Sequence, residues 1–365
     1  MNDLIKKLTN ISLDFSIPKK KKILFYDQNG QSLLKEIIDE EYDIIYSRYE
    51  KINFFLFIYS IFKNLFKIIE KKKLFFHYYL TLISYHKPKI IVTYTDNDIL
   101  FYELKNNCED VVFLAIQNGY RFYEGDLFEI LDKKNLSLKC DFYFAFGKSI
   151  KLKLEKYLEG KIVEAGSLKN NYCKKNNKIK KKQICFISSY GISNLNSEKK
   201  IIEILIQFAK KYEYSLSLLS RTSNKEEEIF FNKLFGNFRF YYINKTENFC
   251  ESYYHLDEAT LSISLNATLG YENIIRGNKT FFINTNDRSF KNSSFTKFGW
   301  PHNFKDEGFF WTKIIDKEII HAKLSEIIQL DEKNWEIRIR DTISKIISYN
   351  ENNYIIKSII KDLLN

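Results

Sequence analysis

The amino-acid sequence predicts an α/β protein built from two doubly wound domains of similar size. Two observations lead to this fold class: short apolar runs alternate with amphipathic segments, and a stretch rich in lysine and asparagine interrupts the alternation near mid-chain. The length of 365 residues suits two domains. Hydrophobic residues make up 45% and charged residues 28% of the chain, which excludes a wholly disordered protein.

Six short runs in the first half are predicted to be strands, because each is β-branched or aromatic and ends in polar residues or glycine. They cover residues 22–27, 43–47, 89–95, 111–117, 140–146 and 161–165. Their hydrophobicity is nearly continuous, which is typical of parallel strands covered by helices on both faces. Residues 1–168 are therefore the predicted N-terminal α/β domain.

Residues 169–182 contain seven lysines and four asparagines and are predicted to be a solvated basic linker, since like charges at this density cannot form a core. The alternation then restarts and predicts a C-terminal α/β domain over 183–330, followed by C-terminal helices over 331–365. Its predicted strands cover residues 183–188, 214–219, 238–243, 260–265 and 279–283. Ligands of such sheets bind beyond the carboxyl ends of the strands, so a central cleft facing both domains is the expected site.

The formal net charge is 57 − 46 = +11, and only eight of the 57 cations are arginine. The abundance of Lys, Ile, Asn, Phe and Tyr is typical of A/T-rich coding, so the charge is weak support for nucleic-acid binding. Five cysteines, an odd number without a CxxC pair, favour a reduced, cytoplasmic compartment.

Residues 52–69 form the most apolar segment, but Lys63, Asn64 and Lys67 interrupt it, so a membrane span is rejected. Two alternatives stay open for residues 52–73. An aromatic helix beside lysines suits peripheral contact with an acidic bilayer surface, and a helix packed into the domain core explains the same pattern equally well.

The segment 261–283 predicts an anion site where a strand runs through a polar turn into a helix. Ser264, Thr268 and the backbone of Leu269 and Gly270 are expected to hold a phosphate, with help from the helix dipole. Glu272 is expected to bind a ribose hydroxyl pair. An ordinary helix N-terminus with a favourable first-turn glutamate is an equally supported interpretation.

These residues carry a resemblance to a known family. Thr268-Leu269-Gly270-Tyr271-Glu272 with Arg276-Gly277-Asn278-Lys279 resembles the S/T-x-x-G-x-E element of GT-B-fold glycosyltransferases, and Phe298-Gly299-Trp300 is similar to a segment of capsule Kdo transferases. Asn266-Ala267 departs from the usual pair of hydroxyl residues. In the first half, Asp96-Asn97-Asp98, Phe101-Tyr102 and Ile116-Gln117-Asn118-Gly119-Tyr120-Arg121 resemble a family of O-antigen biosynthesis proteins.

The resemblance implies a GT-B fold of two Rossmann-like domains, with the donor bound by the C-terminal domain and the acceptor by the N-terminal domain. Ser188, Ser189 and Arg221 follow predicted strands of the C-terminal domain and are expected to contact the donor phosphates. The alternatives are a strand-end turn for the serines and a surface position for the arginine.

Transfer of a sugar needs a base or a carboxylate nucleophile, and Asp96 and Asp98 are the catalytic candidates because they follow a predicted strand. Asp27 is the reserve. Gln117, Asn118 and Arg121 follow the next strand along the chain and are expected to bind the acceptor. Each aspartate also suits a turn-forming role.

The five histidines show no metal-ligand spacing, so no metal and no other cofactor is expected. The predicted function is a glycosyltransferase of a bacterial surface glycan, O-antigen or capsule, using a nucleotide-sugar donor, with CMP-ulosonic acid favoured. UDP- or GDP-hexose donors, and a non-catalytic nucleotide-sugar- or glycan-binding protein, are the alternatives. Nucleic-acid binding through the linker ranks third. The predicted acceptor is a glycan or lipid-linked glycan, and the predicted location is the cytoplasm, with peripheral contact at the inner face of the membrane.

Overall fold

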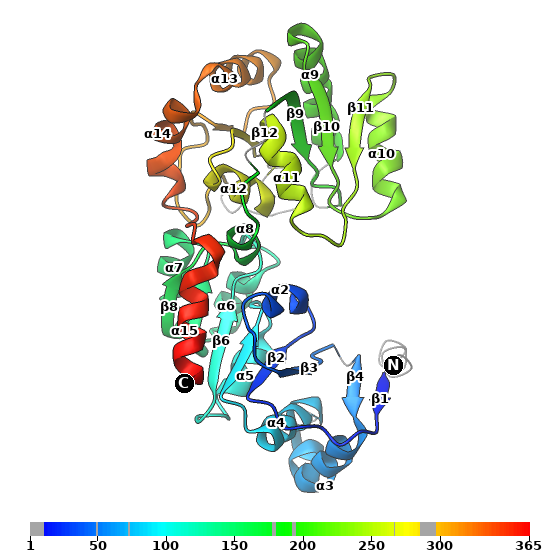
Figure 1. The fold of residues 1–365 in the computed structure, drawn as a ribbon, viewed down its shortest axis with the longest axis vertical. Coiled ribbons are helices and arrows are strands. Elements are labelled where there is room, and N and C mark those ends of the chain that lie inside the picture. Colours follow the sequence, from blue (N-terminus) through cyan, green and yellow to red (C-terminus); the bar gives the residue numbers. More distant parts are fainter. Residues whose placement is uncertain are drawn as a thin grey trace.

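Two parallel six-stranded sheets form the centres of two domains that follow one another along the long axis of the molecule (Figure 1). The computed structural model describes residues 11–48, 50–71, 74–176, 180–191, 195–265, 267–284 and 297–365, and side chains outside 67–71. The paired strands described in the two large sheets are all parallel, which confirms the predicted fold class.

The N-terminal sheet contains all six strands predicted for the first half of the chain. In spatial order they are β3 (Tyr42–Ile45), β2 (Ile23–Tyr26), β5 (Ile90–Thr93), β6 (Val112–Ile116), β7 (Leu138–Ala145) and β8 (Leu158–Glu164). The strand order reverses between β2 and β5, and the carboxyl ends of these two strands are where a ligand of this sheet is expected.

Alternate side chains of each strand enter two different cores, as the period of a strand requires. Leu24 and Tyr26 face one core, which the helices α4 (Leu74–His86), α5 (Ile99–Lys105), α6 (Leu127–Lys134) and α7 (Lys148–Leu154) cover. Ile23 and Phe25 face the other core, which α2 (Gln31–Lys35), α8 (Leu168–Tyr172) and α15 (Tyr354–Leu364) cover.

A small parallel ribbon and a long helix form the end of the N-terminal domain that lies away from the C-terminal domain (Figure 1). The ribbon pairs β1 (Ser12–Asp14) with β4 (Lys51–Asn53), and α3 (Phe54–Lys71) begins directly after β4. The backbone of α3 is non-helical at Asn64. The two short strands were not predicted, because three residues in each carry too little periodic signal.

The C-terminal sheet has the strand order β11-β10-β9-β12-β13-β14. The bounds are β9 (Lys181–Ile187), β10 (Ser215–Leu219), β11 (Phe240–Ile243), β12 (Ala259–Ser264), β13 (Thr280–Ile283) and β14 (Trp311–Thr312). The first five match the predicted strands, and the two-residue β14 was not predicted. The order reverses between β9 and β12, which sets the expected ligand position at the ends of these strands.

The larger core of the C-terminal domain includes side chains of α9 (Leu195–Tyr212), α10 (Lys225–Phe235), α12 (Thr268–Ile275), α13 (Lys317–Gln329) and α14 (Glu332–Ile343). On the opposite face, Leu256 of α11 (Glu251–Glu258) packs against Cys185, Ile187 and Leu219. This smaller core lies directly behind the strand ends that face the N-terminal domain.

The chain crosses between the domains twice. After α14, a 3-10 turn (Glu351–Asn353) leads into α15, whose Ile356 and Ile360 enter the core of the N-terminal domain. The C-terminal helices predicted over 331–365 are thus divided between the two domains, with α14 on one and α15 on the other. The last helix of the chain therefore packs on one face of the N-terminal sheet.

The first crossing differs from the predicted solvated linker over 169–182 at its two ends, whereas Lys174 and Lys175 are exposed as expected of a linker. Leu168, Asn170, Asn171 and Cys173 are buried, and Lys181 and Lys182 begin β9. A disulfide joins Cys173 to Cys250 across 77 positions of sequence, a pairing that the expectation of a reduced compartment did not include. The buried part of this segment was not predicted, because lysines dominate its composition and because asparagines, rather than apolar residues, make the buried contacts.

Candidate functional site

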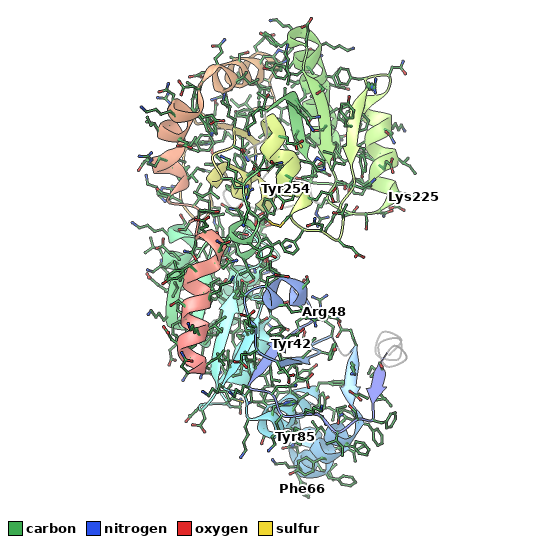
Figure 2. The ribbon with its side chains drawn as sticks, viewed as in Figure 1. Tyr42, Arg48, Phe66, Tyr85, Lys225 and Tyr254 are labelled. Carbon is green, nitrogen blue, oxygen red and sulfur yellow. A yellow bond between two sulfur atoms is a disulfide. The ribbon has the colours of Figure 1, made fainter. Side chains whose placement is uncertain are left out.

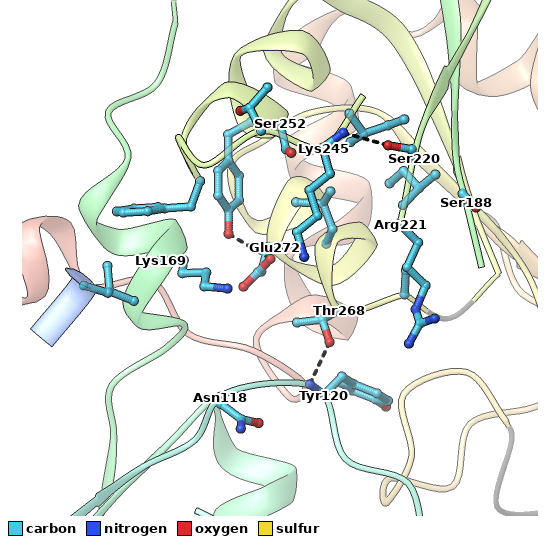
Figure 3. Close-up of a pocket in the computed structure, with 18 of the residues that line it drawn as sticks. Asn118, Tyr120, Lys169, Ser188, Ser220, Arg221, Lys245, Ser252, Thr268 and Glu272 are labelled. Carbon is cyan, nitrogen blue, oxygen red and sulfur yellow. Dashed lines mark hydrogen bonds between the residues drawn. The ribbon is translucent and has the colours of Figure 1, made fainter. Parts of the chain in front are cut away.

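A pocket of about 640 Å³ lies between the two domains, and the carboxyl edges of both sheets face it (Figure 3). From the N-terminal domain it is lined by Asn29, Gly30, Tyr94, Asn118 and Tyr120, among others. From the C-terminal domain it is lined by Ser188, Ser189, Ser220, Arg221, Lys245, Thr268, Leu269 and Glu272, among others. This is the cleft that the arrangement of two doubly wound domains predicts.

Three cations reach the pocket from separate segments: Lys169 from α8, Arg221 after β10 and Lys245 after β11 (Figure 3). Among the described residues, no salt bridge pairs any of the three with a carboxylate. The Arg221 guanidinium donates a hydrogen bond to the Tyr190 carbonyl at 2.9 Å. Glu247 and Glu272 also line the pocket, and the charge of Lys169 acts on Glu272. Three cations converging on one pocket favour an anionic ligand that carries more than one charge.

Partly buried hydrogen bonds stabilise the turns that follow β9, β10 and β11. The Lys245 amide donates to Ser220 Oγ at 2.7 Å, and the Tyr190 amide donates to Ser188 Oγ at 3.1 Å. The buried Glu227 accepts bonds from the amides of Arg221 and Thr222 at 2.9 and 2.8 Å. These contacts fix the two turns that carry the pocket cations Arg221 and Lys245.

Helix α12 begins at Thr268, where its N-terminus meets the N-terminal domain. Thr268 Oγ1 accepts a hydrogen bond from the Tyr120 amide at 2.9 Å (Figure 3). Thr268 and Leu269 line the pocket as predicted, and Asn266 of the same motif lies outside the described residues. The hydroxyl of Thr268 thus takes part in a hydrogen bond between the two domains.

Gly270 and Ser264 do not line the pocket, although both were predicted to contact the donor. A Cβ atom at Gly270 would lie 2.3 Å from Ser264 Oγ and 3.0 Å from the Phe282 ring. The Gly270 amide donates to the Ala267 carbonyl at 2.9 Å. The position requires glycine because α12 packs directly on its sheet, and the two residues therefore have a structural role here.

Glu272 lies on the pocket floor with both carboxylate oxygens hydrogen-bonded. Its Oε1 accepts from the Ser167 hydroxyl and its Oε2 accepts from the Tyr253 hydroxyl, the latter at 2.9 Å. Burial raises the pKa of Glu272, and these hydrogen bonds together with Lys169 oppose the rise. The contact that was predicted between this carboxylate and a ribose stays a prediction, since each oxygen keeps a second acceptor position.

Arg276, from the second part of the motif, anchors the connection between the domains rather than the pocket. It is buried, its Nε donates to Asp257 at 3.0 Å and its Nη1 donates to the Cys173 carbonyl at 2.7 Å. Its guanidinium also lies over the Tyr253 ring, 5.2 Å from the ring centre. One arginine thus holds α11, α12 and the first crossing segment together beneath Glu272.

Asp96 does not line the pocket and has no exposed surface. It accepts hydrogen bonds from the Arg121 guanidinium, the Tyr143 hydroxyl and the Asn118 amide. Burial raises the pKa of Asp96, and Arg121 opposes the rise. Asp96 therefore holds the turn that presents Asn118 to the pocket, and the predicted catalytic role is not supported by this placement.

Asp98, Gln117 and Arg121 also lie outside the pocket lining. Asp98 caps α5 through the Leu100 amide and accepts a hydrogen bond from the Tyr26 hydroxyl at 2.7 Å. Gln117 is buried and bonds the Gly119 carbonyl and the Phe146 amide, both at 2.8 Å. Of the predicted acceptor residues, Asn118 alone reaches the pocket in the described part of the chain.

Beside the pocket, each domain inserts one aromatic side chain into the core of the other. Tyr120, from the N-terminal domain, stacks on Tyr271 at 4.1 Å between ring centres and belongs to the C-terminal core. Trp300, from the C-terminal domain, belongs to the N-terminal core and lies 5.3 Å from Phe128. The Tyr120 hydroxyl donates to the Trp300 carbonyl. The Phe298-Gly299-Trp300 segment thus locks the two domains together.

Sequence reasoning missed several residues that line the pocket: Asn29, Gly30, Tyr94, Lys169, Lys245, Thr246, Glu247 and Tyr253. Asn29 and Gly30 belong to a turn signal after the first strand, which marks a strand end but not a ligand. Lys169 and Lys245 carried no usable signal, because two cations do not stand out among so many lysines. Only their positions in the folded structure distinguish Lys169 and Lys245 from the other lysines.

Among the described residues there is no group of three or more His, Cys, Asp or Glu side chains that could hold a metal ion. The expectation that the protein needs no metal stays a prediction. No described helix combines the length and the apolar character needed to cross a membrane.

The two sheets, their strand order and the pocket between them define the class of the protein: a GT-B-type α/β protein with two Rossmann-like domains. The family model described as "putative O-antigen biosynthesis protein" matches residues 114–214 and 195–364. This is more than half of the chain, and the chain belongs to that family. Its members are assigned by that description to the synthesis of a surface glycan. No curated protein matches the chain in sequence.

Solved structures share the fold along nearly the whole chain. A structure of S. aureus MnaA with UDP has a TM-score of 0.58 at 15% identity, covering 94% of this chain and 97% of that one. The UDP-GlcNAc 2-epimerase of Methanocaldococcus jannaschii, in complex with UDP-GlcNAc and UDP, has a TM-score of 0.56 at 12% identity, covering 94% and 100%. The wall teichoic acid polymerase TagF has a TM-score of 0.53 at 11% identity, covering 99% and 91%.

Proposed function

We propose that this protein is a glycosyltransferase of surface-glycan synthesis that uses a nucleoside-diphosphate sugar as its donor. The observation that carries the proposal is the convergence of Lys169, Arg221 and Lys245 on one pocket at the carboxyl edges of both sheets. A pocket of this size and position suits a nucleotide sugar. The O-antigen family and the UDP-bound structures of the same fold support this choice of ligand.

The placement of the cations, rather than their number, decides between the donor classes in this proposal. A nucleoside-diphosphate sugar carries two negative charges on its diphosphate, whereas CMP-ulosonic acid carries one phosphate charge and a carboxylate on the sugar. Arg221 and Lys245 follow neighbouring strands and are placed to share one diphosphate, with the N-terminus of α12 beside them. A UDP- or GDP-sugar is therefore preferred to the CMP-ulosonic acid that the sequence favoured.

The other side of the pocket provides neutral hydrogen-bonding groups for the acceptor. Asn118 belongs to the turn held by Asp96, and Asn29 and Tyr94 lie near it on the N-terminal domain. The Tyr94 hydroxyl donates to the Asn118 carbonyl at 3.3 Å. In this proposal Asp96 is a positioning residue for the acceptor turn, and neither Asp96 nor Asp98 contacts the sugar directly.

The first test is a thermal-shift panel with UDP, GDP, CDP and CMP. A ligand that binds only the native state raises the melting temperature, so at least one diphosphate is expected to stabilise the protein more than CMP does. Greater stabilisation by CMP would return the donor to the CMP-ulosonic acid class. No stabilisation by any of the four would contradict nucleotide binding altogether.

The second test follows the sugar of the best-binding nucleotide. Consumption of the donor with transfer to a glycan or lipid-linked glycan acceptor is the expected result. Conversion of the donor into its epimer without acceptor would replace the transferase by an epimerase. Tight donor binding without any turnover, with a panel of acceptors present, would favour the non-catalytic binding protein.

A further inference from the structure

We propose that the far end of the N-terminal domain binds the surface of an anionic lipid bilayer. The proposed surface, here called the aromatic face, comprises Leu13, Phe15, Ile17, Phe55, Tyr59, Phe62, Leu65 and Phe66. No residue of the aromatic face lines the inter-domain pocket. Figure 2 labels Phe66 at the end of the molecule away from the C-terminal domain.

The aromatic face concentrates exposed apolar side chains in one place. Among the described residues, 17 large hydrophobic side chains are exposed, and eight of them belong to this face. Ile17, Phe62 and Phe66 are 80%, 77% and 86% exposed. Single exposed hydrophobic residues are ordinary, but a contiguous group of this kind marks an interaction surface.

Two segments that are separated in sequence build the face together. Residues 12–14 pair with residues 51–53 in the β1–β4 ribbon, and α3 starts at the next position. The Phe15 ring lies 5.0 Å from the Phe54 ring, which joins the strand segment to the start of the helix. The face is therefore one surface rather than two unrelated exposed segments.

The spacing along α3 separates an outward stripe from an inward one. Phe55, Tyr59 and Phe62 recur at intervals of four and three and share one side of the helix before the non-helical Asn64, and the exposed Phe66 follows it. Leu56 and Ser60 lie on the other side and are buried. The outward stripe thus carries larger apolar side chains than the inward one, the reverse of a helix that only packs on a core.

The charges around the face match an anionic surface. Residues 11–22 and 51–66 contain six lysines and one acid, Asp14, and Lys21 of this set pairs with Glu41 from outside it. Asp14 is paired with Lys51 at 2.8 Å, and Lys63 Nζ lies 5.8 Å from the centre of the Tyr59 ring. Lysines beside an apolar helix face can reach lipid headgroups while the aromatic rings enter the interface.

The same charges decide against a second copy of this chain as the partner. A two-fold dimer would bring the face against itself, and its lysines would then meet lysines across the contact. A bilayer with anionic headgroups satisfies both the rings and the lysines at once. The non-helical backbone at Asn64 and the absence of a spanning helix among the described residues fit a segment that lies along the surface.

The experiment is co-sedimentation of the full chain with vesicles of phosphatidylcholine alone or mixed with phosphatidylglycerol. We expect binding to the mixed vesicles, weak binding to the neutral ones, and weaker binding as salt is raised. The double variant F62S/F66S should bind the mixed vesicles at least about tenfold more weakly. The matched control I229S/I337S removes two comparably exposed side chains of the C-terminal domain, 67% and 58% exposed, and should bind normally.

Three results would overturn the proposal: equal binding to neutral and anionic vesicles, equal loss in both double variants, or no binding by the wild-type protein. Sedimentation velocity provides a further arm, since a wild-type dimer that F62S/F66S converts to a monomer would make the face a protein interface. The nucleotide shift of F62S/F66S should equal that of the wild type, so failure here and failure of the proposed donor site are distinguishable.

Discussion

Asp96 and Arg121 form a buried ion pair, with Asp96 wholly enclosed and Arg121 4% exposed. A second carboxylate, Asp126, accepts from the same guanidinium at 3.1 Å. Such a pair contributes little net stability compared with apolar residues, but removing one partner leaves a buried charge without its counter-charge. The value of the pair lies in fixing the turn of residues 117–121 between the two domains.

Replacing Asp96 therefore tests a positioning role against a catalytic one. We expect D96N to lower the free energy of unfolding by on the order of 3 kcal/mol, because the Arg121 charge remains buried while one counter-charge is lost. Urea unfolding measures this change. D98N keeps a side-chain acceptor at the N-cap of α5 and should cost less than about 1 kcal/mol. Full stability of D96N with complete loss of turnover would instead support the catalytic role that the sequence predicted.

Arg221 is the residue on which the diphosphate proposal depends most directly. It is exposed at the pocket, and the Gly191 and Tyr190 backbone lies beside its guanidinium. We expect R221A to weaken the affinity for the best nucleoside diphosphate by about tenfold or more, since a charge-assisted hydrogen bond contributes roughly 1.5–3 kcal/mol. Isothermal titration calorimetry measures the change.

The matched control for R221A is R239A, because Arg239 is also exposed in the C-terminal domain and stacks near Tyr241 without lining the pocket. R239A should bind the nucleotide like the wild type. An equal loss in both variants would show a general effect of net charge and would remove Arg221 from the site.

At the scale of elements, α12 shows how one short helix serves both packing and the pocket. Its N-terminal residues Thr268 and Leu269 face the pocket, Gly270 allows close contact with β12, and Glu272 reaches the floor. The following Arg276 ties α12 to α11 and to the crossing segment. Residues of one short sequence motif therefore pack α12 against its sheet and also form part of the pocket wall.

The crossing segment around α8 is also tied to α11 by the Cys173–Cys250 disulfide. The loop it closes spans 77 positions, and constraining the unfolded chain to that extent stabilises a protein by about 4 kcal/mol in the chain-entropy description. We expect a reducing agent to lower the melting temperature of the wild type but not that of the C173S/C250S variant.

Thiol counting provides the control for the disulfide. With the disulfide formed, denatured protein should show 5 − 2 = 3 free thiols, those of Cys108, Cys140 and Cys185. Five free thiols in freshly purified, unreduced protein would contradict the pairing. A C108S variant should keep the sensitivity of the wild type to the reducing agent.

At the scale of the whole molecule, the domains are joined by the two crossing segments of the chain and also by side chains that each domain inserts into the other. Tyr120 and Trp300 each pack in the core of the other domain. Helix α15 follows the C-terminal domain in the chain and packs on one face of the N-terminal sheet. The wall of the pocket formed by residues 117–121 is thus a product of both domains. A large change in their mutual orientation would have to break these aromatic contacts.

The return of α15 gives a prediction for the stability of the N-terminal domain. Ile356 is fully buried against that sheet, so I356A should lower the free energy of unfolding by about 2–5 kcal/mol. Y354A, at a neighbouring position that is 72% exposed, should change it by less than about 0.5 kcal/mol. Chemical denaturation compares the two. A small effect of I356A would show that α15 is not part of the N-terminal core.

Much of the fold could be predicted from local sequence. The runs 22–27, 89–95 and 183–188 are continuously apolar and end in polar turns, and both properties belong to strands buried on two faces. The Thr268–Glu272 motif also indicated a strand end, a turn and a helix start in the right order. Three pocket positions after strands of the C-terminal domain, Ser188, Ser189 and Arg221, followed from the same reasoning.

The rest of the site could not be predicted, because it depends on contacts between segments far apart in the chain. Asp96 and Asn118 follow neighbouring strands, yet which of them reaches the pocket depends on Arg121 and Tyr143 enclosing the carboxylate. Lys169 and Lys245 come together across 76 positions, and no local pattern distinguishes them from other lysines.

The sequence by itself determined the alternation of strands and helices, because buried strands and amphipathic helices leave a periodic signal within a few residues. Tertiary structure alone decided which polar groups face the pocket, which cysteines pair, that the last helix belongs to the first domain, and that the outward side of α3 is its aromatic side. These properties depend on how two finished domains and their connecting segments pack together, and packing between distant segments leaves no period in the chain.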